Sequence, residues 1–134
     1  MRKAAFLSVA LSALVLLPAQ SQAGSAKPNV YRGKTSQGKP IQFSASKTLI
    51  TPIRFKVKML CRDGSLLFGD VSDFEASALR ANGSFSDTQR GNTDMVVFEG
   101  RVKGNQIKGT LRVKDRLPSG VRCDSQPISF TAKR

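Results

Sequence analysis

The clearest pattern in the chain is an alternation of apolar and polar residues from Met95 to Lys114. Gly104 and Asn105 lie near its centre and suit a two-residue type II′ turn, because glycine accepts a positive φ at the first central position. The pattern predicts one β-hairpin, since a register slip of one residue would bury its charged side chains. The predicted inner face pairs Val102 with Ile107, Gly100 with Gly109, Phe98 with Leu111, and Val96 with Val113.

Two glycines stand opposite each other on that inner face. Gly100 and Gly109 have no side chains and leave a gap in the core. We expect that a neighbouring side chain fills this gap or that the sheet bends sharply there.

The outer face of the hairpin carries an excess of positive charge. Arg101 lies directly opposite Lys108 in the predicted register, and directly opposed like charges are unfavourable. Glu99, which is diagonal to Lys108 and Arg112, relieves this repulsion only in part. The excess charge therefore needs another reason or a partner. The basic residues of this face are Arg101, Lys103, Lys108, Arg112 and Lys114.

A second alternation runs from Ile53 to Cys61 and predicts a half-buried strand. Its apolar positions are Ile53, Phe55, Val57, Met59 and Cys61. Its other face is entirely basic and consists of Arg54, Lys56 and Lys58. Cys61 is in phase with the core positions, which suits a buried disulfide.

Shorter alternating segments surround these two patterns and are joined by turns rich in glycine and proline. They are Val30–Thr35, Pro40–Ser46, Leu66–Phe68 and Pro127–Lys133. Polar loops are expected at Thr88–Asp94 and Asp115–Arg122. Short alternating strands of this kind predict a single all-β domain, an antiparallel β-sandwich or small β-barrel of about eight strands.

The segment 73–83 fits two structures. Ser72–Glu75 matches a helix capping box, which would begin a helix. Alternatively, Ala76–Arg80 pairs with Ser84–Asp87 around an Asn-Gly turn. We favour the hairpin because the surrounding elements are all β-strands.

The first 23 residues are expected to be a signal peptide. A charged start at Arg2 and Lys3 precedes the apolar run Ala4–Leu17, and small residues at Ser21–Ala23 suit cleavage. The apolar run is too short to span a membrane, and no second one follows. We therefore expect an exported protein, periplasmic or secreted, whose mature domain covers residues 24–134 and has no transmembrane segment.

Cys61 and Cys123 are the only cysteines, and an exported chain favours a disulfide between them. Because the loop that it closes is long, this disulfide stabilises by roughly 4 kcal/mol on the chain-entropy model. The chain contains no histidine, so an ordinary zinc site is excluded.

The absence of histidine also removes the usual general base near neutral pH. The acidic cluster consists of Asp70, Asp73 and Glu75, of which Asp73 and Glu75 would share one face of a strand. Such a pair permits a hydrolase or a calcium site. A solvated turn explains the same residues, so we expect no catalysis, no metal and no cofactor.

Charge gives the strongest indication of function. The chain holds 22 Lys and Arg against 9 Asp and Glu, a net charge of +13, which falls to +11 without Arg2 and Lys3. If the two basic stripes share a sheet face, they form a plate that attracts polyanions. The candidate binding residues are Arg54, Lys56, Lys58, Arg101, Lys103, Lys108, Arg112 and Lys114.

In an exported protein the expected partner is an anionic envelope polymer or an anionic lipid surface. Nucleic acid is disfavoured, because no exposed aromatic residue alternates with the basic ones. Two alternatives remain open: a solvated face of an ordinary basic protein, and a protein-interaction module or enzyme inhibitor that presents the loop Thr88–Asp94.

An ordered set of short motifs carries a resemblance to a known group. The motifs are Thr35–Gly38, Cys61–Gly64, Asn82–Ser86, Phe98–Arg101, Gly109–Arg112, Cys123 and Ser129–Ala132. Together they resemble a group of small exported bacterial proteins with two cysteines and a β-rich domain. The resemblance implies fold and export, but no activity and no catalytic residue.

Overall fold

The computed structural model describes residues 27–134, and the predicted signal peptide lies outside the described residues. The described chain is all-β and has no helix, as the alternation predicts, and it contains ten strands where about eight were expected. The strands are β1 (Asn29–Thr35), β2 (Pro40–Ala45), β3 (Leu49–Cys61), β4 (Leu66–Ser72), β5 (Ser77–Ala78), β6 (Ser84–Arg90), β7 (Asp94–Lys103), β8 (Gln106–Arg116), β9 (Arg122–Asp124) and β10 (Ile128–Lys133).

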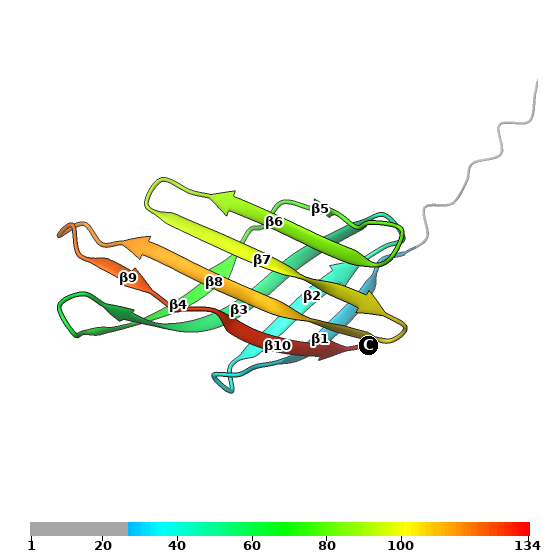
Figure 1. Ribbon diagram of the computed structural model, residues 1–134, viewed down its shortest axis with the longest axis horizontal. Coiled ribbons are helices and arrows are strands. Elements are labelled where there is room, and N and C mark those ends of the chain that lie inside the picture. The colour runs from blue at the N-terminus through cyan, green and yellow to red at the C-terminus, as the bar shows by residue number, and fades with distance from the viewer. Residues whose placement is uncertain (1–26) are drawn as a thin grey trace, which may run out of the picture.

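Six strands close into a small barrel. Their order is β10-β1-β2-β3-β9-β8, and β10 pairs with β8 to complete the ring. β7 and β6 continue the sheet beyond β8, while β4 and β5 pair with β3. In Figure 1, strands β6, β7 and β8 run across the direction of β2 and β3, so the molecule has two walls.

The central hairpin has the predicted register. Val102 pairs with Ile107 and Val96 with Val113, and the turn begins at Gly104, whose φ is 59°. The gap at the paired glycines is filled by two rings. A Cβ atom on Gly100 would lie 2.9 Å from Cζ of Phe85, and one on Gly109 would lie 2.9 Å from Cζ of Phe130. The first expectation for this gap, a neighbouring side chain, is confirmed.

The prediction for Ile53 is wrong, because β2 and β3 pair through a β-bulge. β3 has one more residue than β2 between the pairs Gln42–Arg54 and Phe43–Pro52, and this extra residue is Ile53. Pro52 is therefore buried and Ile53 is 37% exposed. A bulge shifts the phase of the alternation by one residue, which local patterning does not reveal. The other predicted inner residues, Phe55, Val57, Met59 and Cys61, are buried.

The segment 73–83 forms neither a helix nor the predicted hairpin. Its two-residue strand β5 pairs with the start of β3, while β6 pairs with β7. The Asn-Gly turn itself is present, since the Gly83 amide donates to the Arg80 carbonyl at 2.8 Å. The chain therefore reverses at the predicted turn, but β5 pairs with Leu49 and Ile50 of β3 and not with β6.

Both predicted polar loops are shorter than expected. β6 continues to Arg90 and β7 begins at Asp94, so the connection is Gly91–Thr93 rather than Thr88–Asp94. β8 continues to Arg116, which leaves Leu117–Val121 between β8 and β9.

Phenylalanine rings join the two walls of the core. Phe43 of β2 lies 4.9 Å from Phe130 of β10 and 6.5 Å from Phe85 of β6, measured between ring centroids. Phe74 bridges Phe55 of β3 and Phe98 of β7. Because the inner faces of β3 and β7 meet across this core, their outer faces point away from each other.

The predicted disulfide between Cys61 and Cys123 is present and buried. It joins β3 to β9, where the two cysteines are direct cross-strand partners. A disulfide is compatible with an oxidising compartment. Within residues 27–134, no helix has the length and apolar character needed to cross a membrane.

Candidate functional site

The basic stripe on β3 points outwards as predicted. Arg54, Lys56 and Lys58 are all exposed. Arg54 forms an ion pair with Asp70. Its Nε donates to Oδ1 of Asp70 at 2.7 Å, and its Nη2 donates to Oδ2. The hydrogen bond from Arg54 lowers the pKa of Asp70. Arg54 therefore contributes less free charge than the sequence suggests.

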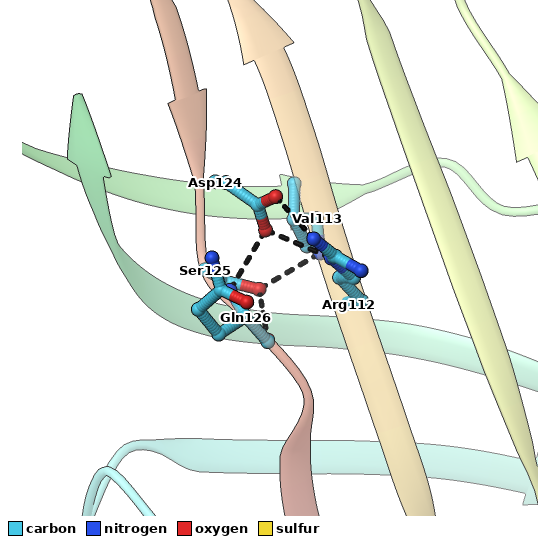
Figure 2. A network of polar contacts seen from close by, with 5 residues as sticks. All are labelled: Arg112, Val113, Asp124, Ser125 and Gln126. Atoms are coloured by element: carbon cyan, nitrogen blue, oxygen red, sulfur yellow. Dashed lines mark hydrogen bonds and ion pairs between the residues drawn. The ribbon is translucent and has the colours of Figure 1, made fainter. Parts of the chain in front are cut away.

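The stripe on the central hairpin also contains an arginine bound to an acid. Arg112 Nε donates to Oδ1 of Asp124 at 2.9 Å, and its Nη2 lies 2.5 Å from Oδ2. Figure 2 shows this pair beside Ser125 and Gln126, where β9 ends. The Gln126 amide donates to Oδ1 of Asp124 at 2.8 Å. Arg112 thus holds the break between β9 and β10 against β8.

The two predicted stripes do not lie on neighbouring strands. β3 and the β7–β8 hairpin belong to different walls of the barrel, and the ring order places β9 between them on one path and β10, β1 and β2 on the other. Arg54 and Arg112 therefore do not belong to neighbouring strands. Only the strand order reveals this separation, because each stripe is defined within a single strand or hairpin.

The strand order instead places six exposed cations on one continuous surface, which we name the basic belt. It crosses β7, β8, β10 and β1, roughly 15 Å along the surface at the usual strand spacing. The belt consists of Arg32, Lys34, Arg101, Lys103, Lys108 and Lys133.

Two neighbouring cross-strand rows make up the belt. The first row runs Arg101–Lys108–Thr131–Lys34 through successive pairs. The second row runs Lys103–Gln106–Lys133–Arg32 and continues through Gln42 to Arg54. Neither row contains an acidic residue.

Like charges are directly opposed twice within the belt. Arg101 is the partner of Lys108, as predicted, and Arg32 is the partner of Lys133. Cβ atoms in such pairs lie about 5 Å apart. Among residues 27–134 the ion pairs are Arg54–Asp70 and Arg112–Asp124, so no belt residue has an ion-pair partner there. The nearest acidic neighbour in the hairpin, Glu99, lies in the next row and accepts from Thr110 at 3.4 Å.

An open hollow of about 280 Å³ borders the belt where β1, β2 and β3 meet. Arg32, Gln42, Arg54 and Lys56 lie along it. This hollow connects the belt to the β3 stripe, so Arg54 and Lys56 stand at the margin of the same basic surface.

A larger hollow of about 740 Å³ lies at the disulfide end of the barrel. It contains Lys114 together with Arg116 and Arg122, which are also direct cross-strand partners. Three carboxylates line the same space, those of Asp94, Asp115 and Asp124. The charge of this hollow is therefore mixed, unlike that of the belt.

The structure does not have the geometry expected for the Asp73–Glu75 site or for the Thr88–Asp94 loop. Asp73 has a φ of 64° and stands outside the strands with Glu75, so the expected shared strand face does not exist. No cluster of three or more acidic, histidine or cysteine side chains in residues 27–134 is suited to a metal ion. The segment Thr88–Asp94, expected to present an inhibitory loop, is largely strand.

Sequence reasoning missed half of the belt. Arg32 and Lys34 alternate with the buried residues Tyr31 and Thr35, and this alternation places them outside. Lys133 follows the buried Ala132 in the same way. The sequence pattern does not reveal that β1 pairs with β10 and that β10 pairs with β8. These pairings bring Arg32, Lys34 and Lys133 beside the hairpin.

The chain matches no protein-family model, no curated protein and no solved structure.

Proposed function

We propose that this protein is an exported, non-enzymatic binding module whose basic belt holds a linear anionic polymer of the cell envelope. The observation that carries the proposal is the side-by-side placement of two directly opposed cation pairs, Arg101–Lys108 and Arg32–Lys133, in rows without an acid. Such pairs are unfavourable alone. A bound anion between them converts this repulsion into attraction.

The curvature of the surface favours a polymer over a lipid surface as the occupant of the belt. The belt crosses the barrel strands β1, β10 and β8 and continues onto β7, so a flat bilayer would touch only part of it. A flexible acidic polysaccharide or teichoic-type chain can follow the wall and place several anions over successive strands. Binding of this kind is screened by salt.

Export rests on the predicted signal peptide in residues 1–23, and the disulfide is compatible with it. The resemblance to small exported two-cysteine proteins points to the same compartment. The absence of histidine, a sequence property, supports a binding role over general acid–base catalysis.

The proposal is tested with heparin, a sulfated polysaccharide, as the probe. The variant Lys34→Glu, Lys108→Glu, Lys133→Glu reverses three charges at the centre of the belt. We expect it to elute from a heparin column at much lower salt than the wild type. The slope of log affinity against log salt should fall by roughly two, because about three contacts are lost.

A matched control carries the same change in net charge elsewhere. Lys47→Glu, Arg116→Glu, Arg122→Glu alters three exposed cations outside the belt. This control should elute close to the wild type, and circular dichroism should show that both variants are folded. Equal losses in the two variants would mean that net charge alone governs binding. Failure of the wild type to bind heparin would mean that the belt does not hold an acidic polysaccharide; either result would refute the proposal.

A further inference from the structure

The outer face of the β3–β4 hairpin gathers the most exposed large apolar side chains among residues 27–134. Leu60 is 60% exposed, Leu66 is 55% exposed and Phe68 is 64% exposed. Leu60 and Leu66 are direct cross-strand partners, and Phe68 lies two residues further along β4. We name this contiguous group the apolar triad. Contiguous exposed apolar patches mark interaction surfaces.

Lysines flank the Phe68 side of the apolar triad. Lys58 is the cross-strand partner of Phe68, and Lys56 lies two residues away on the same face of β3. Lys39, in the β1–β2 turn, holds its Nζ 5.7 Å from the centre of the Phe68 ring. Asp70, the carboxylate on this face of β4, is engaged by Arg54. Asp124, the cross-strand partner of Leu60 on β9, is engaged by Arg112. The face therefore has an apolar centre, lysines beside Phe68, and carboxylates at Asp70 and Asp124 that are paired with arginines.

Two hydrogen bonds hold the β1–β2 turn in position beside this face. The side-chain amide of Gln37 donates to the Lys58 carbonyl and accepts from the Lys58 amide, each at 2.8 Å. Gln37 thus extends the sheet where β2 no longer pairs with β3. Lys39 is fixed next to Phe68 as a consequence.

The geometry points to an anionic lipid bilayer as the partner of this face, with the apolar triad inserted and Lys39, Lys56 and Lys58 among the head groups. Side chains on a sheet stand perpendicular to it, so a flat boundary parallel to the hairpin buries the triad together. Lysine stems reach along apolar surface to keep their charges at the head groups. In Figure 1 the β3–β4 turn lies at one end of the molecule, where it can approach a surface.

Two other occupants fit this face less well. A second copy would bring Lys56 and Lys58 against their own counterparts, in a chain whose net charge is +13. An extended segment added to the free edge of β4 would pair in the plane of the sheet and leave Leu66 and Phe68 in solvent.

The chain contains no tryptophan, so Phe68→Trp creates a single fluorescent reporter at the centre of the patch. The probes are phosphatidylcholine vesicles with and without phosphatidylglycerol. We expect the emission to shift to the blue and to resist aqueous quenchers only with phosphatidylglycerol vesicles. The control Leu49→Trp, at another exposed apolar position of β3, should not shift.

A second variant measures the contribution of the triad itself. Leu60→Ser, Leu66→Ser, Phe68→Ser should weaken vesicle binding roughly tenfold or more and leave heparin elution unchanged. The matched control Leu49→Ser, Ile53→Ser should bind vesicles like the wild type.

Three results would overturn the inference. An unshifted tryptophan emission from the vesicle-bound Phe68→Trp variant would mean adsorption through other cations. Unchanged vesicle binding by the triple serine variant would mean the same. A wild-type dimer in sedimentation velocity that the triple serine variant dissolves would assign the face to a second copy. Heparin elution of the belt variant bears on none of these, so the two proposals fail separately.

Discussion

At the scale of single residues, the glycine pair shows how a missing side chain shapes the core. Gly100 and Gly109 are cross-strand partners, and the rings of Phe85 and Phe130 occupy the space that Cβ atoms would take. The alternation of the hairpin predicted that these positions face inwards. Phe85 lies on β6 and Phe130 on β10. The packing of these two strands against the hairpin therefore determines which side chains fill the gap.

We expect Gly109→Ala to destabilise the protein by about 1–3 kcal/mol, the range for overpacking a core. The added Cβ would lie 2.1 Å from the Glu99 carbonyl oxygen and 2.9 Å from the Phe130 ring. The measurement is the midpoint of urea unfolding, with Ser129→Ala on the exposed face of β10 as the control. An unchanged midpoint for Gly109→Ala would show that the Glu99 carbonyl and the Phe130 ring both move aside without cost.

At the scale of elements, the Arg112–Asp124 pair holds the end of β9 against β8, next to the interruption between β9 and β10. β9 and β10 are separated by Ser125–Pro127, and Gln126 has a φ of 57° there. Ser125 holds the break to β8, because its hydroxyl accepts from the Val113 amide at 2.9 Å and donates to the Gln126 carbonyl at 2.8 Å. The interruption lets one chain segment pair with β3 through β9 and with β1 through β10.

This pair predicts a loss of stability in acid. The hydrogen bond from Arg112 lowers the pKa of Asp124, so near the ordinary carboxyl pKa of about 4 the unfolded chain binds more protons than the folded one. The stabilisation is complete above that range and disappears as the pH falls through the lowered pKa. Asp124→Asn should be less stable than the wild type at neutral pH and should lose less stability on acidification.

Urea unfolding at several pH values checks this expectation. The matched comparison is Asp70→Asn, which removes the ion pair with Arg54. Asp70 is 39% exposed against 26% for Asp124, so solvent screens its pair more and the effect should be smaller. Parallel pH profiles for Asp124→Asn and the wild type would contradict the assignment.

At the scale of the whole molecule, the disulfide stabilises the short pairing between β3 and β9 that helps to close the barrel. β9 has three residues and meets β3 in the pairs Leu60–Asp124 and Cys61–Cys123. The cysteines are 62 residues apart, so the link removes much freedom from the unfolded chain. Replacing both by serine should lower the free energy of unfolding by roughly 4 kcal/mol.

Denaturant unfolding with and without reductant measures this effect. The wild type should lose stability in reductant, whereas the double serine variant should not respond. Equal midpoints for oxidised and reduced wild type would show that strand pairing alone stabilises the contact between β3 and β9.

The strand order also places the two proposed binding surfaces on different strands. The basic belt lies over β7, β8, β10 and β1, and the apolar triad lies on the β3–β4 hairpin. A protein with both would hold an anionic polymer on one side while resting on lipid with another. This arrangement follows from the strand order, not from the composition, and the two surfaces adjoin at Lys56, which borders both.

The sequence alone determined the local features of this protein. Strand identity, the central hairpin register, the outward direction of its cations and the disulfide all follow from period-two alternation, a Gly-Asn turn and two cysteines. These signals are local because side-chain direction in a strand depends only on position within it. The same logic failed at Ile53, where a bulge shifted the phase.

Only the tertiary structure decided which strands became neighbours. It separated Arg54 from Arg112, joined Arg32, Lys34 and Lys133 to the hairpin, and paired β5 with β3 instead of β6. Strand order depends on which closed arrangement of the strands buries the most apolar surface, including the phenylalanine side chains. That is a property of the whole chain, which no single stretch of alternating residues contains.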